Sequence, residues 1–280
     1  MSNLTISYYA NLAHKILTSS GEGKQYLDNR EVIRLLFTSS DWNLNNYKED
    51  KQRQKLKARL TLIDSYYSTN VGSFCFDGID EIVEGIIAIK TSDTELKKYS
   101  KEFIDNISNE HEIWKLLNNK YGWNILNKDG LKATSLISKF IYFLMDYKFP
   151  IYDSFVKKYH TRIFKYFKNT DFFTIRLPKS DSELSLFYRL REMNGPIDDF
   201  EKLDNLLWLT GKIAKGSFYL ILEKERHKEL IERSKNYGGR RYSDNIIKYI
   251  CGEEKDFSDI FSGDLIEFIN LVKKITGLCS

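Results

Sequence analysis

One stretch decides the fold class: GLKATSLISKFIYF at residues 130–143, followed by KFPIYDS at residues 148–154. Its apolar residues recur at helical spacing from Leu136 to Leu144. Pro150 ends this pattern, because a proline ring disfavours α geometry in the residue before it. Asp153 then stands where it can cap a second helix. The stretch therefore predicts a helix, a sharp turn and a capped helix.

The same helical periodicity extends over most of the chain, which has only three prolines and fifteen glycines. Further helices are predicted at 3–18, 30–37, 55–67, 79–89, 96–107, 113–117, 182–191, 203–209, 218–234, 246–250 and 265–275. Only residues 172–178 have much strand character. These patterns predict an all-α protein.

The composition is ordinary for a globular chain. The 280 residues suffice for two packed lobes or one large domain, with 42% hydrophobic and 29% charged residues. Neither a signal peptide nor an apolar run long enough to span a membrane is recognisable. Cys75, Cys251 and Cys279 match neither a disulfide framework nor a metal-binding spacing. We therefore expect a reduced, cytoplasmic protein without a metal site.

Positive charge is concentrated near the middle of the chain. Residues 128–168 contain nine basic and three acidic residues, a net charge of +6, whereas the whole chain carries +4. A basic segment interleaved with aromatic residues can attract a phosphate backbone. A solvated lysine face explains the charge equally well.

The central stretch resembles the helix-hairpin-helix DNA glycosylase superfamily, which includes endonuclease III and the adenine and 8-oxoguanine glycosylases. The run FPIYDSFVKK at 149–158 is similar to the adenine-glycosylase run F-P-I-L-D-G-N-V-K-R. Gly130-Leu131-Lys132 corresponds to the exit of the family's hairpin, and Asp153 to the aspartate before the next helix. Residues 60–70 and 204–212 are similar to two further helices of the family. The resemblance covers about residues 55–215.

The chain departs from the family pattern in two places. The family's hairpin has an apolar residue followed by Pro-Gly-Val-Gly, whereas residues 126–132 read LNKDGLK, with one glycine. No four-cysteine array follows Gly211, so an iron–sulfur cluster is not expected. The resemblance thus implies a divergent member without a cofactor, or a protein that kept the fold and lost the chemistry.

The resemblance implies an architecture of two helical lobes with a cleft between them. The first would be a helical barrel over residues 55–150 with a degenerate hairpin. The second would combine residues 1–54 and 151–280, including a C-terminal extension.

The resemblance also implies roles for particular residues. A glycosylase flips its target nucleotide into a pocket and supports the developing sugar cation with a carboxylate, here Asp153. Lys132 corresponds to the lysine that forms a Schiff base, and Lys139, placed on the same helical face, is the alternative nucleophile or a phosphate ligand. The expected DNA-binding residues are Lys128, Lys157, Lys158 and Arg162. The expected base-pocket residues are Asn70, Trp123 and Tyr152.

Three hypotheses follow from these observations. The first is a DNA glycosylase, with or without lyase activity, that excises a damaged or modified base from double-stranded DNA. The second is a non-catalytic nucleic-acid-binding protein on the same scaffold, in a restriction or phage-defence system. The third is an α-helical interaction protein, in which the likeness to the family at residues 149–158 is accidental. For the single residues the alternatives are a plain helix cap at Asp153, solvated lysines and core packing of most of the aromatic residues.

Overall fold

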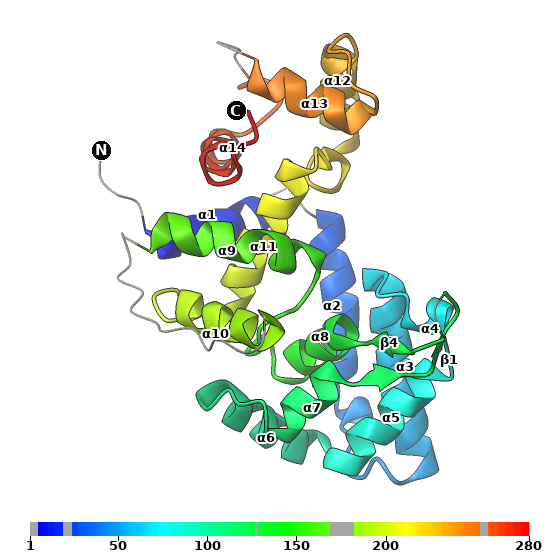
Figure 1. The fold of residues 1–280 in the computed structure, drawn as a ribbon. Helices are drawn as coiled ribbons and strands as arrows, with labels where there is room; N and C mark the ends of the chain where they lie inside the picture. The colour runs from blue at the N-terminus through cyan, green and yellow to red at the C-terminus, as the bar shows by residue number, and fades with distance from the viewer. Residues whose placement is uncertain (1–4, 19–23, 127, 169–181, 253–256, 280) are drawn as a thin grey trace. The chain divides into compact units, whose positions relative to one another are not determined.

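The computed structural model describes residues 5–18, 24–126, 128–168, 182–252 and 257–279, which are mainly helical (Figure 1). With 69% helix, the all-α prediction is confirmed at the level of fold class. The described residues contain the α-helices α1 (Ile6–Thr18), α2 (Lys24–Thr38), α3 (Asp50–Tyr67), α4 (Val71–Phe74), α5 (Gly78–Ile89), α6 (Asp93–Asp105), α7 (Glu112–Asn118), α8 (Thr134–Leu144), α9 (Ser154–Phe167), α10 (Ser182–Asn194), α11 (Phe200–Ala214), α12 (Lys224–Ser234), α13 (Tyr242–Cys251) and α14 (Gly263–Thr276).

The chain divides into two compact units. Unit 1 comprises residues 1–28, 154–176 and 192–280, and unit 2 comprises residues 29–153 and 177–191. The lobe expected over residues 55–150 lies within unit 2, to which residues 29–54 also belong.

Helix α8 forms the centre of unit 2. Every residue of this helix except Ser135 is buried. It packs against α3, α6 and α7 (Figure 1). The ring of Phe37, on α2, lies with its centroid 5.5 Å from that of Phe140 and 6.0 Å from that of Phe143. The helix predicted from the central stretch is therefore also the helix around which this core is built.

Two short antiparallel ribbons belong to unit 2. Strand β1 (Cys75–Phe76) pairs with β3 (Trp123–Asn124), and β2 (Lys120–Tyr121) pairs with β4 (Leu131–Lys132). The expectation that strand character is confined to residues 172–178 is therefore wrong, and those residues themselves lie outside the described part of the chain. A two-residue strand is too short to show a periodicity of two in the sequence.

Two glycines make the ribbons possible. Gly122 and Gly130 have φ angles of 59° and 76°, a region that glycine enters at little cost. A Cβ atom on Gly122 would lie 2.1 Å from the carbonyl oxygen of Phe76. A Cβ atom on Gly130 would lie 2.8 Å from the carbonyl oxygen of Gly122. The segment expected to be a degenerate hairpin, residues 126–132, thus ends in β4, which directly follows Gly130 and pairs with β2.

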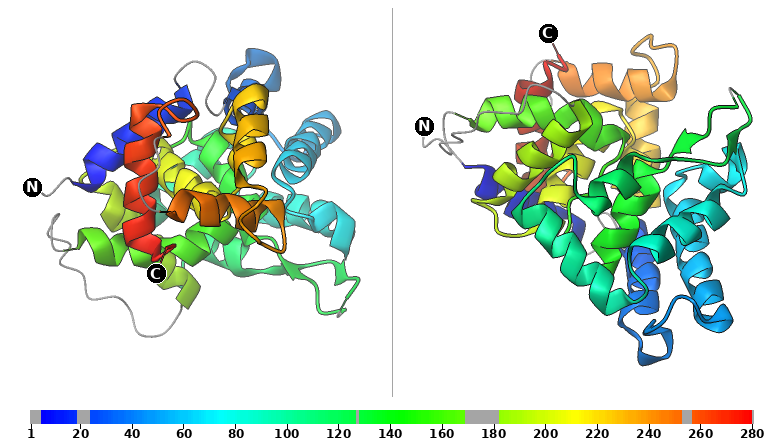
Figure 2. Two further views of the ribbon diagram at one scale, coloured as in Figure 1. Left: turned by 90° about the horizontal axis from the view of Figure 1, so that it is seen from above. Right: turned by 60° about the horizontal axis from the view of Figure 1, so that its bottom comes forward.

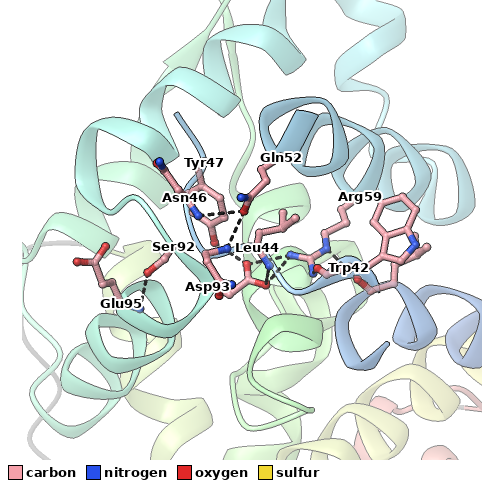
Figure 3. Close-up of polar contacts among 11 residues, drawn as sticks. Trp42, Leu44, Asn46, Tyr47, Gln52, Arg59, Ser92, Asp93 and Glu95 are labelled. Carbon is pink, nitrogen blue, oxygen red and sulfur yellow. Dashed lines mark hydrogen bonds and ion pairs between the residues drawn. The ribbon is translucent and has the colours of Figure 1, made fainter. Parts of the chain in front are cut away.

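A buried ion pair joins α3 to the start of α6 in unit 2 (Figure 3). The side chains of Arg59 and Asp93 are 0% and 5% exposed, and Arg59 Nη1 lies 2.9 and 3.0 Å from the two carboxylate oxygens. The hydroxyl of Tyr47 donates to the same carboxylate at 2.6 Å, and burial, with this anion nearby, raises the pKa of Tyr47 far above its ordinary value. The backbone completes the network. The N–H of Leu44 donates to the Asp93 carboxylate, and Arg59 donates to the carbonyl oxygens of Leu36 and Trp42. The network fixes the segment between α2 and α3.

Helix α11 forms the centre of unit 1, where it packs against α1, α9 and α14 (Figure 2). Gly211 permits the close approach of α9, because a Cβ atom there would lie 2.3 Å from Cδ1 of Phe155. The ring of Trp208 stacks on that of Tyr26, with centroids 4.2 Å apart. The hydroxyl of Tyr26 donates to the buried carboxylate of Asp204 at 2.8 Å.

One sequence expectation about the cysteines is wrong. Cys251, at the end of α13, and Cys279, after α14, form a disulfide with Cα atoms 5.3 Å apart. The pairing depends on how the chain folds over a separation of 28 residues, which cysteine spacing alone does not reveal. Cys75 is a free, buried thiol.

Two kinds of feature are absent from the described residues. None of their helices combines the length and apolar character needed to cross a bilayer. Nor do they include a group of three or more His, Cys, Asp or Glu side chains placed to hold a metal ion.

Candidate functional site

A hydrogen bond in unit 2 links α8 to the segment before α9, next to two residues that are expected to carry chemistry. The hydroxyl of Ser138 accepts a hydrogen bond from the backbone N–H of Tyr152 at 3.0 Å and donates to the carbonyl oxygen of Ser135 at 3.1 Å. This contact ties the segment that precedes α9 to the second turn of α8. Lys139 follows Ser138 in the chain and Asp153 follows Tyr152. The hydrogen bond therefore connects the residue before Lys139 to the residue before Asp153.

Lys139 is buried, with only 3% of its surface exposed. Its Nζ donates to the hydroxyl of Ser135 at 2.7 Å and lies 5.3 Å from the centroid of the Tyr67 ring. Burying an amine costs free energy unless polar partners compensate, and the hydroxyl and the ring face both do so. Lys139 is therefore a positioned side chain, unlike the solvated lysine that its residue type predicts.

Asp153 directly precedes α9, as the position of Pro150 predicts. Its side chain is half-buried. The N-terminal end of a helix carries partial positive charge, which favours a carboxylate at this position. The preceding helix ends at Leu144, earlier than Pro150 alone predicts, and Asp146 and Tyr147 after it have positive φ angles.

Glu183, near the start of α10, connects two of the expected site residues. Its carboxylate accepts a hydrogen bond from Lys132 Nζ at 3.1 Å and one from the Tyr152 hydroxyl at 3.3 Å. Partial burial, together with this carboxylate, raises the pKa of Tyr152 to about 12. The ring of Tyr152 also stacks on Phe187, one helical turn after Glu183, with centroids 6.3 Å apart. No local sequence signal distinguishes Glu183 from other acidic residues on helices.

The expected position of Lys132 is wrong. Lys132 lies in β4, opposite Lys120, whereas α8 begins at Thr134. Lys132 and Lys139 therefore do not share a helical face, because residue 132 is paired as a strand before the helix begins. The side chain of Lys132 is 42% exposed and has the carboxylate of Glu183 as its partner.

Asn70 lies between α3 and α4, exposed and with a φ angle of 62°. The residues on either side of it surround the carboxylate of Asp64. The backbone N–H groups of Val71 and Gly72 each donate to it at 2.9 Å, and the hydroxyl of Thr69 donates to it as well. These bonds fix the conformation from which the side chain of Asn70 projects.

Trp123 and Lys128 lie together. The side chain of Trp123 is 58% exposed on β3, and Nζ of Lys128 lies 5.6 Å from the centroid of its ring. This is the geometry of a cation–π contact. Trp123 thus occupies an open surface, and Lys128 is exposed beside it.

The remaining basic residues lie on α9, in unit 1, a helix with no acidic residue. Lys157 and Lys158 are exposed. Arg162 is exposed too, but its Nη1 donates to the carbonyl oxygen of Thr276 at 2.7 Å. Thr276 is the last residue of α14, where helix carbonyl groups lack partners within the helix. Arg162 therefore has a structural role within unit 1.

The side chains around α8 supply a buried amine, a half-buried carboxylate, a phenol and an ion pair. A carboxylate can stabilise a developing cation, and an amine can act as a nitrogen nucleophile. Comparison of the chain with protein-family models, curated proteins and solved structures finds no match.

Proposed function

We propose that this protein binds DNA and cleaves the N-glycosidic bond of a damaged or modified base, in the manner of a DNA glycosylase. The single observation that carries the proposal is the hydrogen bond between Ser138 Oγ and Tyr152 N–H. It joins the backbone beside Lys139 to the backbone beside Asp153, and a glycosidic cleavage site needs a carboxylate and a nucleophile in one place.

In the proposed reaction the base leaves with the electron pair of its bond to the sugar and is protonated. The carboxylate of Asp153 supports the positive charge that develops on the sugar. A water molecule, or an unprotonated lysine amine, then bonds to the sugar carbon and loses one proton, which balances the proton taken up by the leaving base. We assign Lys139 as the first candidate for such an amine, because the Ser138–Tyr152 hydrogen bond lies next to it and to Asp153 in the chain, and Lys132 as the second, because it is paired with Glu183.

The proposal includes double-stranded DNA as the partner and the cytoplasm as the location. Lys128, Lys157 and Lys158 are exposed and are proposed to contact phosphates. Arg162 is a weaker candidate because of its bond to Thr276. Asn70, Trp123 and Tyr152 are proposed to contact bases, and no cofactor is required.

The test is a base-release assay on a panel of duplexes that carry single damaged or modified bases. Asp153→Asn should fold, because Asn caps a helix about as well as Asp, yet release base about a hundredfold more slowly. Borohydride should trap a covalent DNA adduct with the parent and not with Lys139→Gln, since only an amine forms a Schiff base. Lys132→Gln is the matched control and should still trap. Base release that is undiminished in Asp153→Asn would contradict the proposal.

A second candidate is a non-catalytic nucleic-acid-binding protein, of the kind used in restriction or phage defence. The ion pair between Lys132 and Glu183 favours it, because an amine held by a carboxylate is a poor nucleophile. The parent would then bind DNA and neither release a base nor trap. An absence of DNA binding at low salt would favour an interaction protein instead.

A further inference from the structure

Four large, exposed apolar side chains lie on the β1–β3 ribbon or next to it in the chain, in unit 2. Phe76 lies opposite Trp123 in the register, and the N–H of Ile125 donates to the carbonyl oxygen of Phe74 at 2.8 Å, which extends the pairing by one position. Phe76 and Trp123, which are paired across the ribbon, lie on the same side of it, and Phe74, at the end of α4, and Ile125, directly after β3, adjoin them. We call Phe74, Phe76, Trp123 and Ile125 the aromatic face.

The two sides of this ribbon differ sharply in exposure. Phe76, Trp123 and Ile125 are 63%, 58% and 53% exposed, and Phe74 is 38% exposed. Cys75 and Asn124, on the opposite side, are 4% and 7% exposed. Large apolar residues gathered on a surface mark a site of interaction more often than residues scattered singly do. The burial of one side leaves the aromatic face as the side available to a partner.

The conformation around the aromatic face is specified closely by the chain. Gly122, directly before Trp123, has no room for a Cβ atom. Lys128 has a φ angle of 62°, which is uncommon for a residue with a side chain. In this conformation Nζ of Lys128 lies over the Trp123 ring, 5.6 Å from the centroid. Figure 1 shows β1 at the periphery of unit 2, beside α4.

Charged groups beside the aromatic face bear on the kind of partner. Lys128 and Lys120 are exposed, and so are Asp77, Glu81 and Asp129, with Glu81 accepting a hydrogen bond from the N–H of Gly122 at 2.7 Å. The ammonium group of Lys128 lies over the Trp123 ring, so the chain presents an aromatic surface and a positive charge together. An unpaired nucleotide presents a flat base that stacks on an aromatic ring and a phosphate that attracts an ammonium group.

We propose that the aromatic face binds single-stranded or locally unpaired nucleic acid, with bases stacked on Trp123 and Phe76 and with Lys128 and Lys120 near the phosphates. The inference rests on the nucleic-acid binding within the proposed function, but not on the chemistry assigned to Asp153 and Lys139. It also assigns Trp123 to an open stacking surface instead of an enclosed base pocket.

The test measures the affinity of the full-length protein for labelled oligothymidylate by fluorescence anisotropy. Trp123→Ala and Phe76→Ala should each weaken binding about five- to a hundredfold, the range that stacking of one base provides. Trp123→Phe should retain most of the affinity, because phenylalanine also stacks. The matched control is Tyr242→Ala, which removes an aromatic ring that is 50% exposed in unit 1 and should change nothing.

A second readout reports on the tryptophan itself. Trp123 is 58% exposed, whereas Trp114 and Trp208 are 3% and 9% exposed and Trp42 is half-buried. Oligothymidylate should quench the fluorescence of the parent, and most of the quenching should disappear in Trp123→Phe while binding persists. Circular dichroism of each variant establishes that it is folded.

The outcomes separate this inference from the catalytic proposal. Parent-like affinity in a Phe76→Ala, Trp123→Ala double variant overturns the aromatic face, whether or not base release occurs. Loss of affinity in that variant, with no base release by the parent, supports the aromatic face and removes the catalytic proposal. Self-association of the parent that Trp123→Ala abolishes, with oligothymidylate binding unchanged, would assign the face to a second copy of the chain and overturn the inference.

Discussion

At the scale of single residues, the buried ion pair between Arg59 and Asp93 predicts a large loss of stability when one partner is removed. Arg59→Met should lower the free energy of unfolding by about 3–5 kcal/mol, because it leaves a carboxylate buried without its partner. Urea unfolding measures the loss. Arg53→Met, on the same helix, is the matched control and should cost less than about 1 kcal/mol, since Arg53 and Glu84 are both about half exposed.

The double variant Arg59→Met, Asp93→Asn sharpens this test. It removes both charges, so it should recover part of the stability that Arg59→Met loses. If Arg59→Met is as stable as the parent, the pair does not hold the segment between α2 and α3.

Tyr152 provides a residue-scale prediction about pH. Its pKa is raised from 10.0 to about 12 by burial and by the carboxylate of Glu183. Because the folded-state pKa exceeds the unfolded one, its contribution to stability is fully present below about pH 10 and is lost as the pH rises toward about 12. An ultraviolet titration of the parent minus that of Tyr152→Phe isolates this group and should have its midpoint near 12.

Glu183→Gln tests the second cause of that shift. The variant removes the anion but keeps a polar side chain of similar size, so the midpoint should move back toward 10.0 without reaching it, because burial remains. An unchanged midpoint would mean that Glu183 does not act on the Tyr152 hydroxyl.

At the scale of elements, the packing of α9 on α11 depends on Gly211. Gly211→Ala should lower the free energy of unfolding by about 1–3 kcal/mol, because the added methyl group would overlap the Phe155 ring. Thermal unfolding followed by circular dichroism measures the change. Gly263→Ala, in α14, is the control and should be neutral or slightly stabilising, since a Cβ atom on Gly263 would have no neighbour within 4 Å. If Gly211→Ala and Gly263→Ala change the free energy of unfolding equally, the close approach of α9 to α11 at Gly211 does not contribute to stability.

At the scale of the whole molecule, DNA binding should depend strongly on salt. Replacing Lys157 and Lys158 on α9 with Ala should reduce the slope of log affinity against log salt by about one unit for each phosphate that the protein no longer binds. The matched control replaces Lys97 and Lys98, an exposed pair on α6, a helix that also carries four acidic residues. The control should change the slope less. If both double variants reduce the slope equally, the salt dependence reflects the net charge of the protein and not phosphate contacts at Lys157 and Lys158.

Local patterns predict the structure well where the physical cause is itself local. The apolar spacing of residues 136–144 predicts α8, because one face of a helix must be buried. Pro150 and Asp153 predict the start of α9, because proline restricts the residue before it and aspartate favours a helix N-terminus. A two-residue strand shows no such pattern, which is why the sequence does not reveal that Lys132 belongs to β4 and not to a helix.

The sequence by itself determined the helical fold class, the central position of residues 130–154 and most of the helices, since these depend on residues within a few positions of one another. Only the tertiary structure decided which side chains meet. Glu183 reaches Lys132 across 51 positions, Arg59 reaches Asp93 across 34, and Cys251 reaches Cys279 across 28. It also decided that Lys139 is buried and Trp123 exposed, although either residue type occurs in either environment. Such pairings and exposures depend on how distant segments pack, which no short-range pattern encodes.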